Sequence, residues 1–118
     1  MQGKRTERYA ELIKQSLSQS ILTKIRDPRM GFVTVTRVEI TPDLKFAKVY
    51  YTVLGEDKVL RSTAAALDHS RGFLQKELSN EVEMRIVPTL QFHFDKSIGE
   101  SIKIEEILKK INDEEQSE

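Results

Sequence analysis

The stretch FVTVTRVEITPDLKFAKVYYTVL, residues 32–54, decides the fold because it contains two β-rich runs separated by a turn. Residues 32–40 and 45–54 are dense in Val, Thr, Phe and Tyr, which favour strands. Between them, Thr41-Pro42-Asp43-Leu44 places Pro and Asp at positions that suit a tight reversal. The two runs therefore predict an antiparallel hairpin.

The alternation of apolar residues indicates which face of each strand is buried. In the second strand one face is expected to point to the core, and it carries Ala47, Val49, Tyr51 and Val53. In the first strand the apolar side chains divide between two faces, with Val33 and Val35 on one and Phe32, Val38 and Ile40 on the other. The sequence leaves open which face of the first strand lies inside.

Upstream of the hairpin, apolar residues recur at three- and four-residue spacings, which is typical of an amphipathic helix over residues 5–25. The stripe consists of Tyr9, Leu12, Ile13, Leu17, Ile21, Leu22 and Ile25. Pro28 disfavours helical backbone at Asp27. The helix is therefore expected to stop near Arg26, with residues 27–29 forming a turn.

Downstream of the hairpin, Gly55-Glu56-Asp57 opens a second helical region with acids in its first turn, where the helix dipole favours them. The helical period runs through two sets of residues, Val59, Leu60, Thr63, Ala64 and Leu67, then Phe73, Leu74 and Leu78. Ser70-Arg71-Gly72 lies between the sets, and a glycine inside a helix costs about 1 kcal/mol relative to Ala. We expect a kink or a join between two helices there; the alternative is a glycine kept for close packing.

The remaining elements are a third strand and a C-terminal helix. Alternation over residues 84–94 predicts the strand, and Pro88 in its middle indicates an edge or a bulge because proline cannot donate to a ladder. Ile104, Ile107, Leu108 and Ile111 indicate a short amphipathic helix, followed by an acidic tail. The class is a small α+β sandwich with a three-stranded sheet, divided into a domain over 1–98 and a C-terminal helix and tail over 99–118.

The charge of the chain is balanced in total but unevenly distributed. Of 19 basic and 19 acidic residues, residues 1–48 carry ten basic and five acidic ones, whereas residues 99–118 carry three and seven. Phosphate contacts depend on local cation density, so a basic front and an acidic tail favour a nucleic-acid partner. The alternative is an unevenly charged but merely solvated surface.

The sequence offers little for catalysis. It has no Cys, only His69 and His93 with no metal-ligand spacing, and no glycine-rich phosphate loop, so no metal, cofactor or nucleotide site is expected. No export signal or membrane-spanning run is found, and we expect a cytoplasmic protein. A hydrolase would need a carboxylate pair or an Arg and Asn meeting in a cleft, which no motif indicates.

A binding module fits the sequence better than an enzyme. Basic side chains recur on the first helix, on a strand, at the helix break and on the last strand, and such cations can neutralise phosphates. With no Trp and three Tyr, recognition of RNA shape and backbone is favoured over base stacking. The second hypothesis is a protein-interaction adaptor without RNA affinity, whose acidic tail engages a basic partner.

Several short motifs, in order and spacing, resemble the bacterial ribosome-binding factor A family over about residues 4–112. They are Arg5 and Arg8, Asp27-Pro28-Arg29 with Gly31, Val38, Asp43-Leu44, Ala47-Lys48-Val49-Tyr50, Ser70-Arg71-Gly72-Phe73, Arg85-Ile86-Val87-Pro88-Thr89-Leu90, Phe92 and Asp95. The resemblance implies a type II KH-like fold, in which the family has an Ala-x-Gly kink instead of the usual GXXG loop. This chain departs from that pattern by carrying Ser70 where Ala is usual, and a serine hydroxyl can bond back to a helix carbonyl.

The resemblance also implies an assembly factor that binds the immature small ribosomal subunit and its 16S ribosomal RNA and assists 5′ end maturation. No covalent step is required of such a factor, and we expect a monomer because nothing in the sequence demands more. Release would follow when the mature RNA structure or an assembly GTPase disfavours the bound state. The positions expected to contact RNA follow from charge, placement and family match: Arg5, Arg8, Arg29, Lys45, Lys48, Ser70, Arg71, Gly72, Lys76 and Arg85.

Overall fold

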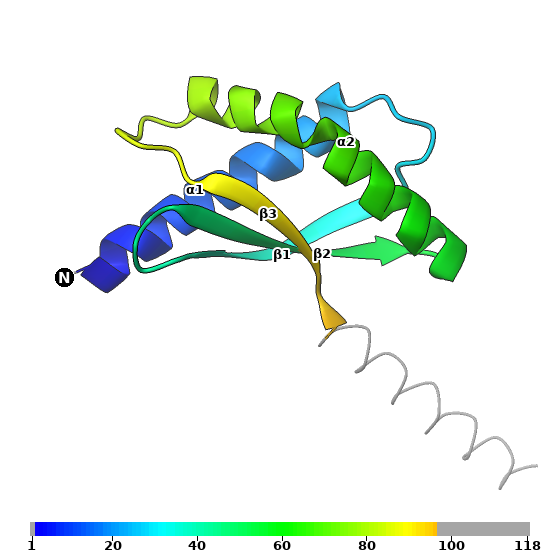
Figure 1. The fold of residues 1–118 in the computed structure, drawn as a ribbon, viewed down its shortest axis with the longest axis horizontal. Helices are drawn as coiled ribbons and strands as arrows, with labels where there is room; N and C mark the ends of the chain where they lie inside the picture. Colours follow the sequence, from blue (N-terminus) through cyan, green and yellow to red (C-terminus); the bar gives the residue numbers. More distant parts are fainter. Residues whose placement is uncertain (1, 97–118) are drawn as a thin grey trace, which may run out of the picture.

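A three-stranded sheet with two long helices on one of its faces forms the molecule (Figure 1). The computed structural model describes residues 2–96. The elements in chain order are α1 (Gln2–Lys24), β1 (Phe32–Ile40), β2 (Phe46–Leu54), α2 (Asp57–Glu81) and β3 (Thr89–Phe94). The predicted α+β class is confirmed, and the hairpin strands match their predicted bounds to within one residue.

The sheet has the order β1-β2-β3, so β2 is central and β3 is an edge strand. β1 and β2 pair antiparallel, as the hairpin prediction requires, whereas β3 lies parallel to β2. A parallel neighbour needs a crossover connection, and α2 supplies it. The edge position predicted for the strand near Pro88 is confirmed.

A β-bulge at Thr36 settles which face of β1 is inside. Val35 lies opposite Tyr51 and Arg37 lies opposite Tyr50, so Thr36 is an extra residue in the ladder. The shift turns both halves of the strand toward the helices: Val35 is buried, and Val33, Val38 and Ile40 pack against the core. Each set of apolar residues seen in the sequence is therefore inside, except Phe32, which is 66% exposed.

The core lies between the helices and the sheet. It is built from Ile13, Leu17 and Ile21 of α1, Ala47, Val49 and Tyr51 of β2, Leu67, Leu74 and Leu78 of α2, and Leu90 of β3. The buried set predicted for β2 is confirmed, with Val53 partly buried. The stripe predicted for α1 was too wide, because Leu12 and Leu22 are 43% and 72% exposed.

The predicted join between two helices is wrong, because α2 is one continuous helix of 25 residues through Ser70 and Gly72. Its axis nevertheless changes direction near its middle (Figure 1). A continuous ladder of helical bonds tolerates such a bend at a residue without a side chain. Of the two expected alternatives, the structure therefore shows the kink and not the join between two helices (Figure 1).

The third strand is shorter than predicted, because β3 begins at Thr89, after Pro88, and Met84 and Ile86 lie outside it. Gln75 of α2 holds this start: its Nε2 donates to the Pro88 carbonyl at 2.9 Å, and its Oε1 accepts from the Leu90 N–H at 2.9 Å. Proline has no N–H for a ladder, so pairing with β2 begins only at the next residue.

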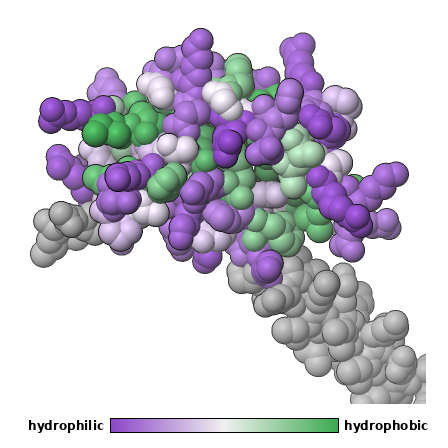
Figure 2. Space-filling view, in the orientation of Figure 1, coloured by the Kyte–Doolittle hydropathy of each residue, from purple (hydrophilic) through white to green (hydrophobic). Residues whose placement is uncertain are grey.

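The C-terminal helix and acidic tail predicted from the sequence, and with them the segment 99–118, lie outside the described residues. Within residues 2–96, neither helix is apolar enough over its length to span a bilayer. Figure 2 shows one face of the molecule, on which hydrophilic side chains dominate and hydrophobic ones form separate patches.

Candidate nucleic-acid interface

The loop between α1 and β1 is folded around the carboxylate of Asp27. Its Oδ1 accepts hydrogen bonds from the Arg29 backbone N–H at 2.9 Å and from Nε at 3.1 Å, and Oδ2 accepts one from Nη2 at 2.8 Å. These bonds, led by those of the Arg29 side chain, lower the pKa of Asp27 from 3.8 to about 2. Arg29 is therefore a cation that already has an acidic partner.

Gly31 fixes the same loop against the first half of α2. Its N–H donates to Thr63 Oγ1 at 2.9 Å, and a Cβ added to Gly31 would lie 2.7 Å from Val59 Cγ1. Ser62 Oγ also donates to the Arg29 carbonyl at 3.0 Å. Only glycine lets the loop approach the helix this closely, so these backbone contacts hold the loop together with the Asp27–Arg29 pair.

A groove of about 600 Å³, here called the loop groove, runs between this loop and the middle of α2. It is lined by Lys24, Ile25, Arg26, Asp27, Pro28, Arg29, His69, Ser70 and Phe73. Three cations and a histidine border the groove, but Lys24 is paired with Glu77 and Glu81 and Arg29 with Asp27, so an anion would be attracted mainly by Arg26. The ring of Phe73, 45% exposed, adds an apolar wall.

The cations of the loop groove differ in how free they are to meet a ligand. Lys24 Nζ is paired with Glu77 and, at 3.1 Å, with Glu81 Oε1, and these pairs raise the pKa of Lys24. Arg26 is exposed and makes no hydrogen bond or ion pair with any described residue. Arg26 is therefore the cation of this groove most available to a phosphate.

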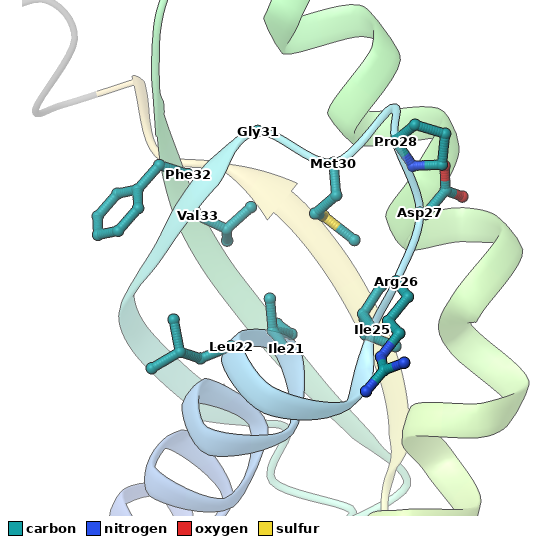
Figure 3. A pocket seen from close by; sticks show the side chains of 10 residues that line it. All are labelled: Ile21, Leu22, Ile25, Arg26, Asp27, Pro28, Met30, Gly31, Phe32 and Val33. Carbon is teal, nitrogen blue, oxygen red and sulfur yellow. The ribbon is translucent and has the colours of Figure 1, made fainter.

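Arg26 also borders a neighbouring pocket of about 400 Å³ at the end of α1 (Figure 3). The figure shows Ile21, Met30 and Val33 turned toward one another and Phe32 turned away. The pocket shares residues 25–28 with the loop groove, so the two hollows meet along one stretch of loop. The charged and apolar parts of this end of the molecule are thus contiguous.

A second groove, here called the strand groove, lies on the other side of α2, between that helix and β3. Its volume is about 370 Å³, and it is lined by Tyr51, Ala64, Asp68, Arg71, Gln91, Phe92 and His93. Arg71 is exposed and has no hydrogen bond or ion pair within the described chain. β3 is an edge strand of the described sheet, and its residues 91–93 border the same groove.

Ser70 and Gly72 occupy different surroundings on α2. Ser70 is 8% exposed, and its hydroxyl makes no hydrogen bond with the described residues. The predicted back-bond is therefore absent here, although Ser79 makes one to the Gln75 carbonyl at 3.0 Å. Gly72 is exposed, and a Cβ there would meet no atom within 4 Å, so close packing does not explain this glycine.

The ten positions predicted to contact RNA are not gathered into one patch. Arg29 and Ser70 line the loop groove, Arg71 lines the strand groove, and Gly72 and Lys76 lie on the exposed side of α2. Arg5 borders a pocket with Pro42 and Leu44, and this places the start of α1 by the hairpin turn that carries Lys45. Of the others, Arg8 on α1 and Arg85 in the loop before β3 are exposed, and Lys48 on the sheet is half-buried.

Sequence reasoning missed four residues of the loop groove: Lys24, Arg26, His69 and Phe73. His69 and Phe73 stand four residues apart on α2, and this spacing puts them on one side of the helix. In the sequence, Phe73 was recognised as part of the helical period and of the Ser70-Arg71-Gly72-Phe73 motif, and that motif was the one available signal for its place beside Ser70.

Chemistry beyond binding has no support in the described part of the chain. Among residues 2–96, no three His, Cys, Asp or Glu side chains come together as a metal site would require. The shifted pKa values belong to structural pairs such as Asp27 with Arg29 and Lys24 with Glu77.

Comparison with known proteins identifies the relatives of this fold. The family model of ribosome-binding factor A matches residues 5–108. Ribosome-binding factor A of Geotalea uraniireducens is 41% identical over 115 residues, which is 98% of this chain and 94% of that protein. The Staphylococcus carnosus protein of the same name is 44% identical over 112 residues, covering 95% of this chain and 97% of its own.

Solved structures agree with the sequence relatives. The crystal structure of ribosome-binding factor A from Thermus thermophilus superposes with a TM-score of 0.68 at 26% identity, covering 75% of this chain and 93% of that one. A Thermus thermophilus homology model fitted into a cryo-EM map of a complex with the 30S subunit has a TM-score of 0.59 at 28% identity, covering 74% and 91%. The predicted family resemblance is confirmed, and the chain belongs to the ribosome-binding factor A family.

Proposed function

We propose that this protein binds the small ribosomal subunit during its assembly, through 16S ribosomal RNA, and acts by binding without catalysing a reaction. The observation that carries the proposal is the family match over residues 5–108, together with a relative that was fitted into a complex with the 30S subunit. The subunit is largely RNA on its surface, so a partner needs places for phosphates.

The two grooves on either side of α2 suit this partner. Each contains an arginine with no acidic partner in the described chain, Arg26 in the loop groove and Arg71 in the strand groove. An arginine fork matches the geometry of a phosphate. The helix between the grooves would then lie along the RNA backbone, with a phosphate on each flank.

The finer role is that of an assembly factor for the immature subunit. Binding free energy would favour one conformation of the 16S RNA late in maturation, including the conformation needed for processing of its 5′ end. The protein, as a monomer in the cytoplasm, would leave when the mature RNA structure or an assembly GTPase disfavours the bound form. No covalent step is required of it.

Sedimentation of cell extract through sucrose gradients at low and high salt tests the proposal. The wild-type protein should travel with free small subunits at low salt and leave them at high salt, because phosphate contacts release counterions. The double variant Arg26→Gln/Arg71→Gln should dissociate at lower salt, with about tenfold weaker binding. Arg61→Gln is the matched control, since it removes one exposed cation from α2 outside both grooves.

Two results would contradict the proposal. Absence from the small-subunit fraction at low salt, in cells that accumulate immature subunits, would exclude subunit binding. Association that resists both salt and RNase would instead favour the protein-interaction adaptor. Primer extension on 16S RNA tests the finer role: depletion should leave extended 5′ ends, and the double variant should restore processing less well than Arg61→Gln.

A further inference from the structure

The sheet has a second face that α1 and α2 leave uncovered (Figure 1). Ala47, Val49 and Tyr51 point toward the helices, so the alternation of β2 turns Lys48 and Tyr50 to the opposite side. The uncovered face is defined here by six residues: Arg37 and Glu39 of β1, Lys48 and Tyr50 of β2, and Gln91 and His93 of β3.

Three flat side chains form a row across this face. Arg37 is paired with Tyr50, and Tyr50 with His93, by the register of the three strands. The guanidinium carbon of Arg37 lies 4.1 Å from the centre of the Tyr50 ring, and the Tyr50 and His93 rings are 5.5 Å apart with planes inclined by 31°. The row is therefore already ordered in the free protein, which lowers the entropy lost on binding.

The neighbouring row adds charge and hydrogen-bonding groups. Lys48 stands two residues from Tyr50 on the same face, about 6.6 Å along the strand, with Gln91 beside it. Glu39 is the single acid of the six, and its Oε1 lies 3.5 Å from Arg37 Nε. Among these six residues two cations stand beside one acid, and the carboxylate of Asp95, next in the alternation of Gln91 and His93, accepts a hydrogen bond from Thr36 Oγ1 at 2.6 Å.

The face is continuous with the strand groove, because His93 and Gln91 of the edge strand border both. An RNA strand whose phosphate meets Arg71 can thus cross the edge of β3 and reach the row. Flat rings and arginine planes on an open sheet are the usual seat of unpaired bases, and a nearby lysine neutralises their phosphates.

From this arrangement we propose that the Arg37–Tyr50–His93 row is a second RNA contact, which stacks one or two unpaired nucleotides of the bound RNA. The proposal rests on the proposed function and names the chemical class of its ligand at a second site. It also departs from the expectation drawn from composition, which favoured backbone recognition over stacking because the chain has few aromatic residues. The sheet compensates for the small number of aromatic residues by placing Tyr50 in one row with the flat side chains of His93 and Arg37.

The test uses full-length protein and a single-stranded RNA octamer that carries one 2-aminopurine, whose fluorescence is quenched when the base stacks. Tyr50→Val keeps a strand-forming residue but removes the ring, and it should weaken binding about tenfold and abolish the quenching. Tyr50→Phe should retain both. Thr52→Val is the matched control on the same strand and face, and thermal unfolding checks that each variant folds.

The salt dependence separates the two contacts. Stacking neutralises no phosphate, so Tyr50→Val should keep the wild-type salt slope, whereas Arg71→Gln should reduce it. Unchanged binding of Tyr50→Val, or equal loss in Tyr50→Phe, would overturn the stacking proposal. Wild-type protein that binds the small subunit but not the octamer would overturn it while leaving the proposed function intact.

A protein ligand on this face would give a different result. In that case Tyr50→Val would weaken association with the subunit after RNase treatment and leave octamer binding unchanged, and stacking would again be excluded. Failure to bind either the subunit or the octamer would count against the proposed function itself.

Discussion

The α1–β1 loop and the middle of α2 border the same groove, but they are held in opposite ways. The loop is fixed by an Asp27–Arg29 pair and by a glycine pressed against α2, whereas Gly72 has open space around it. A fixed loop can position a ligand, and a bent stretch of helix with open space around it can adjust to one. We therefore expect the loop to act as the rigid side of the groove, and the stretch of α2 around Gly72, next to the groove residues Ser70 and Phe73, to act as its adjustable side.

The largest expected effect comes from forcing the rigid side apart. Gly31→Ala places a Cβ 2.7 Å from Val59 Cγ1 and 3.0 Å from Thr63 Oγ1, and neither side chain can swing away freely. Overpacking of this kind costs about 1–3 kcal/mol. Urea unfolding should show that loss, and Gly31→Ala/Val59→Ala should lose less than the two single variants together. Strict additivity would mean that the contact with Val59 is not the cause.

Gln75 anchors the second half of α2 to the start of β3. Loosening of this anchor can be measured separately from any change in the bend of the helix. Gln75→Leu removes both hydrogen bonds to the start of β3 and leaves the Leu90 N–H without its partner. An unsatisfied buried donor costs about 1–3 kcal/mol. Amide exchange should speed up at Leu90, while Gln75→Glu, which keeps the acceptor, should protect that N–H better. Equal exchange in both variants would contradict the role given to the side chain.

The adjustable side is expected to gain stability when its glycine is replaced. Gly72→Ala meets no atom within 4 Å and removes a residue that is unfavourable inside a helix, so it should stabilise the protein by about 0.5–1 kcal/mol. If the bend serves binding, the same variant should bind the small subunit more weakly although it unfolds later. Asn80→Ala, an exposed position nearer the end of α2, is the control for a change in helix propensity alone.

The parts predicted correctly from the sequence are those that local pattern decides. The hairpin strands and the buried residues Ile13, Leu17 and Ile21 follow from period and turn chemistry within a few residues. The buried face of β1 could not be predicted, because the bulge at Thr36 is tied to Asp95 by a hydrogen bond of 2.6 Å across 59 positions of sequence.

For the candidate site, too, the sequence predicts local features but not the contacts between distant segments. Arg29 and Arg71 were predicted from charge, placement and family match, and both line grooves, although their contact with RNA stays a prediction. The exposure of Phe73 could not be predicted, because a helical period does not say which side of a bent helix is covered. The row of Arg37, Tyr50 and His93 depends on the parallel pairing of β3, which the alternation of residues does not reveal.

The smallest expected effect tests the charge that closes the rigid loop. The Arg29 hydrogen bonds lower the pKa of Asp27 from 3.8 to about 2, so the charged carboxylate favours the folded state. That contribution is fully present above pH 4 and is lost as the pH falls from about 4 toward 2. Asp27→Asn should therefore lower the urea midpoint slightly at pH 6 and by less at pH 2.5.

If the urea midpoints of Asp27→Asn and wild type differ by the same amount at pH 6 and pH 2.5, the shape of the Asp27 side chain, and not its charge, holds the loop. Since Asn leaves the Arg29 side chain without an acidic partner, the variant should also steepen the salt dependence of binding to the small subunit by up to one phosphate contact. An unchanged slope would show that Arg29 closes the loop and takes no part in meeting the RNA, so that Arg26 is the principal arginine of the loop groove.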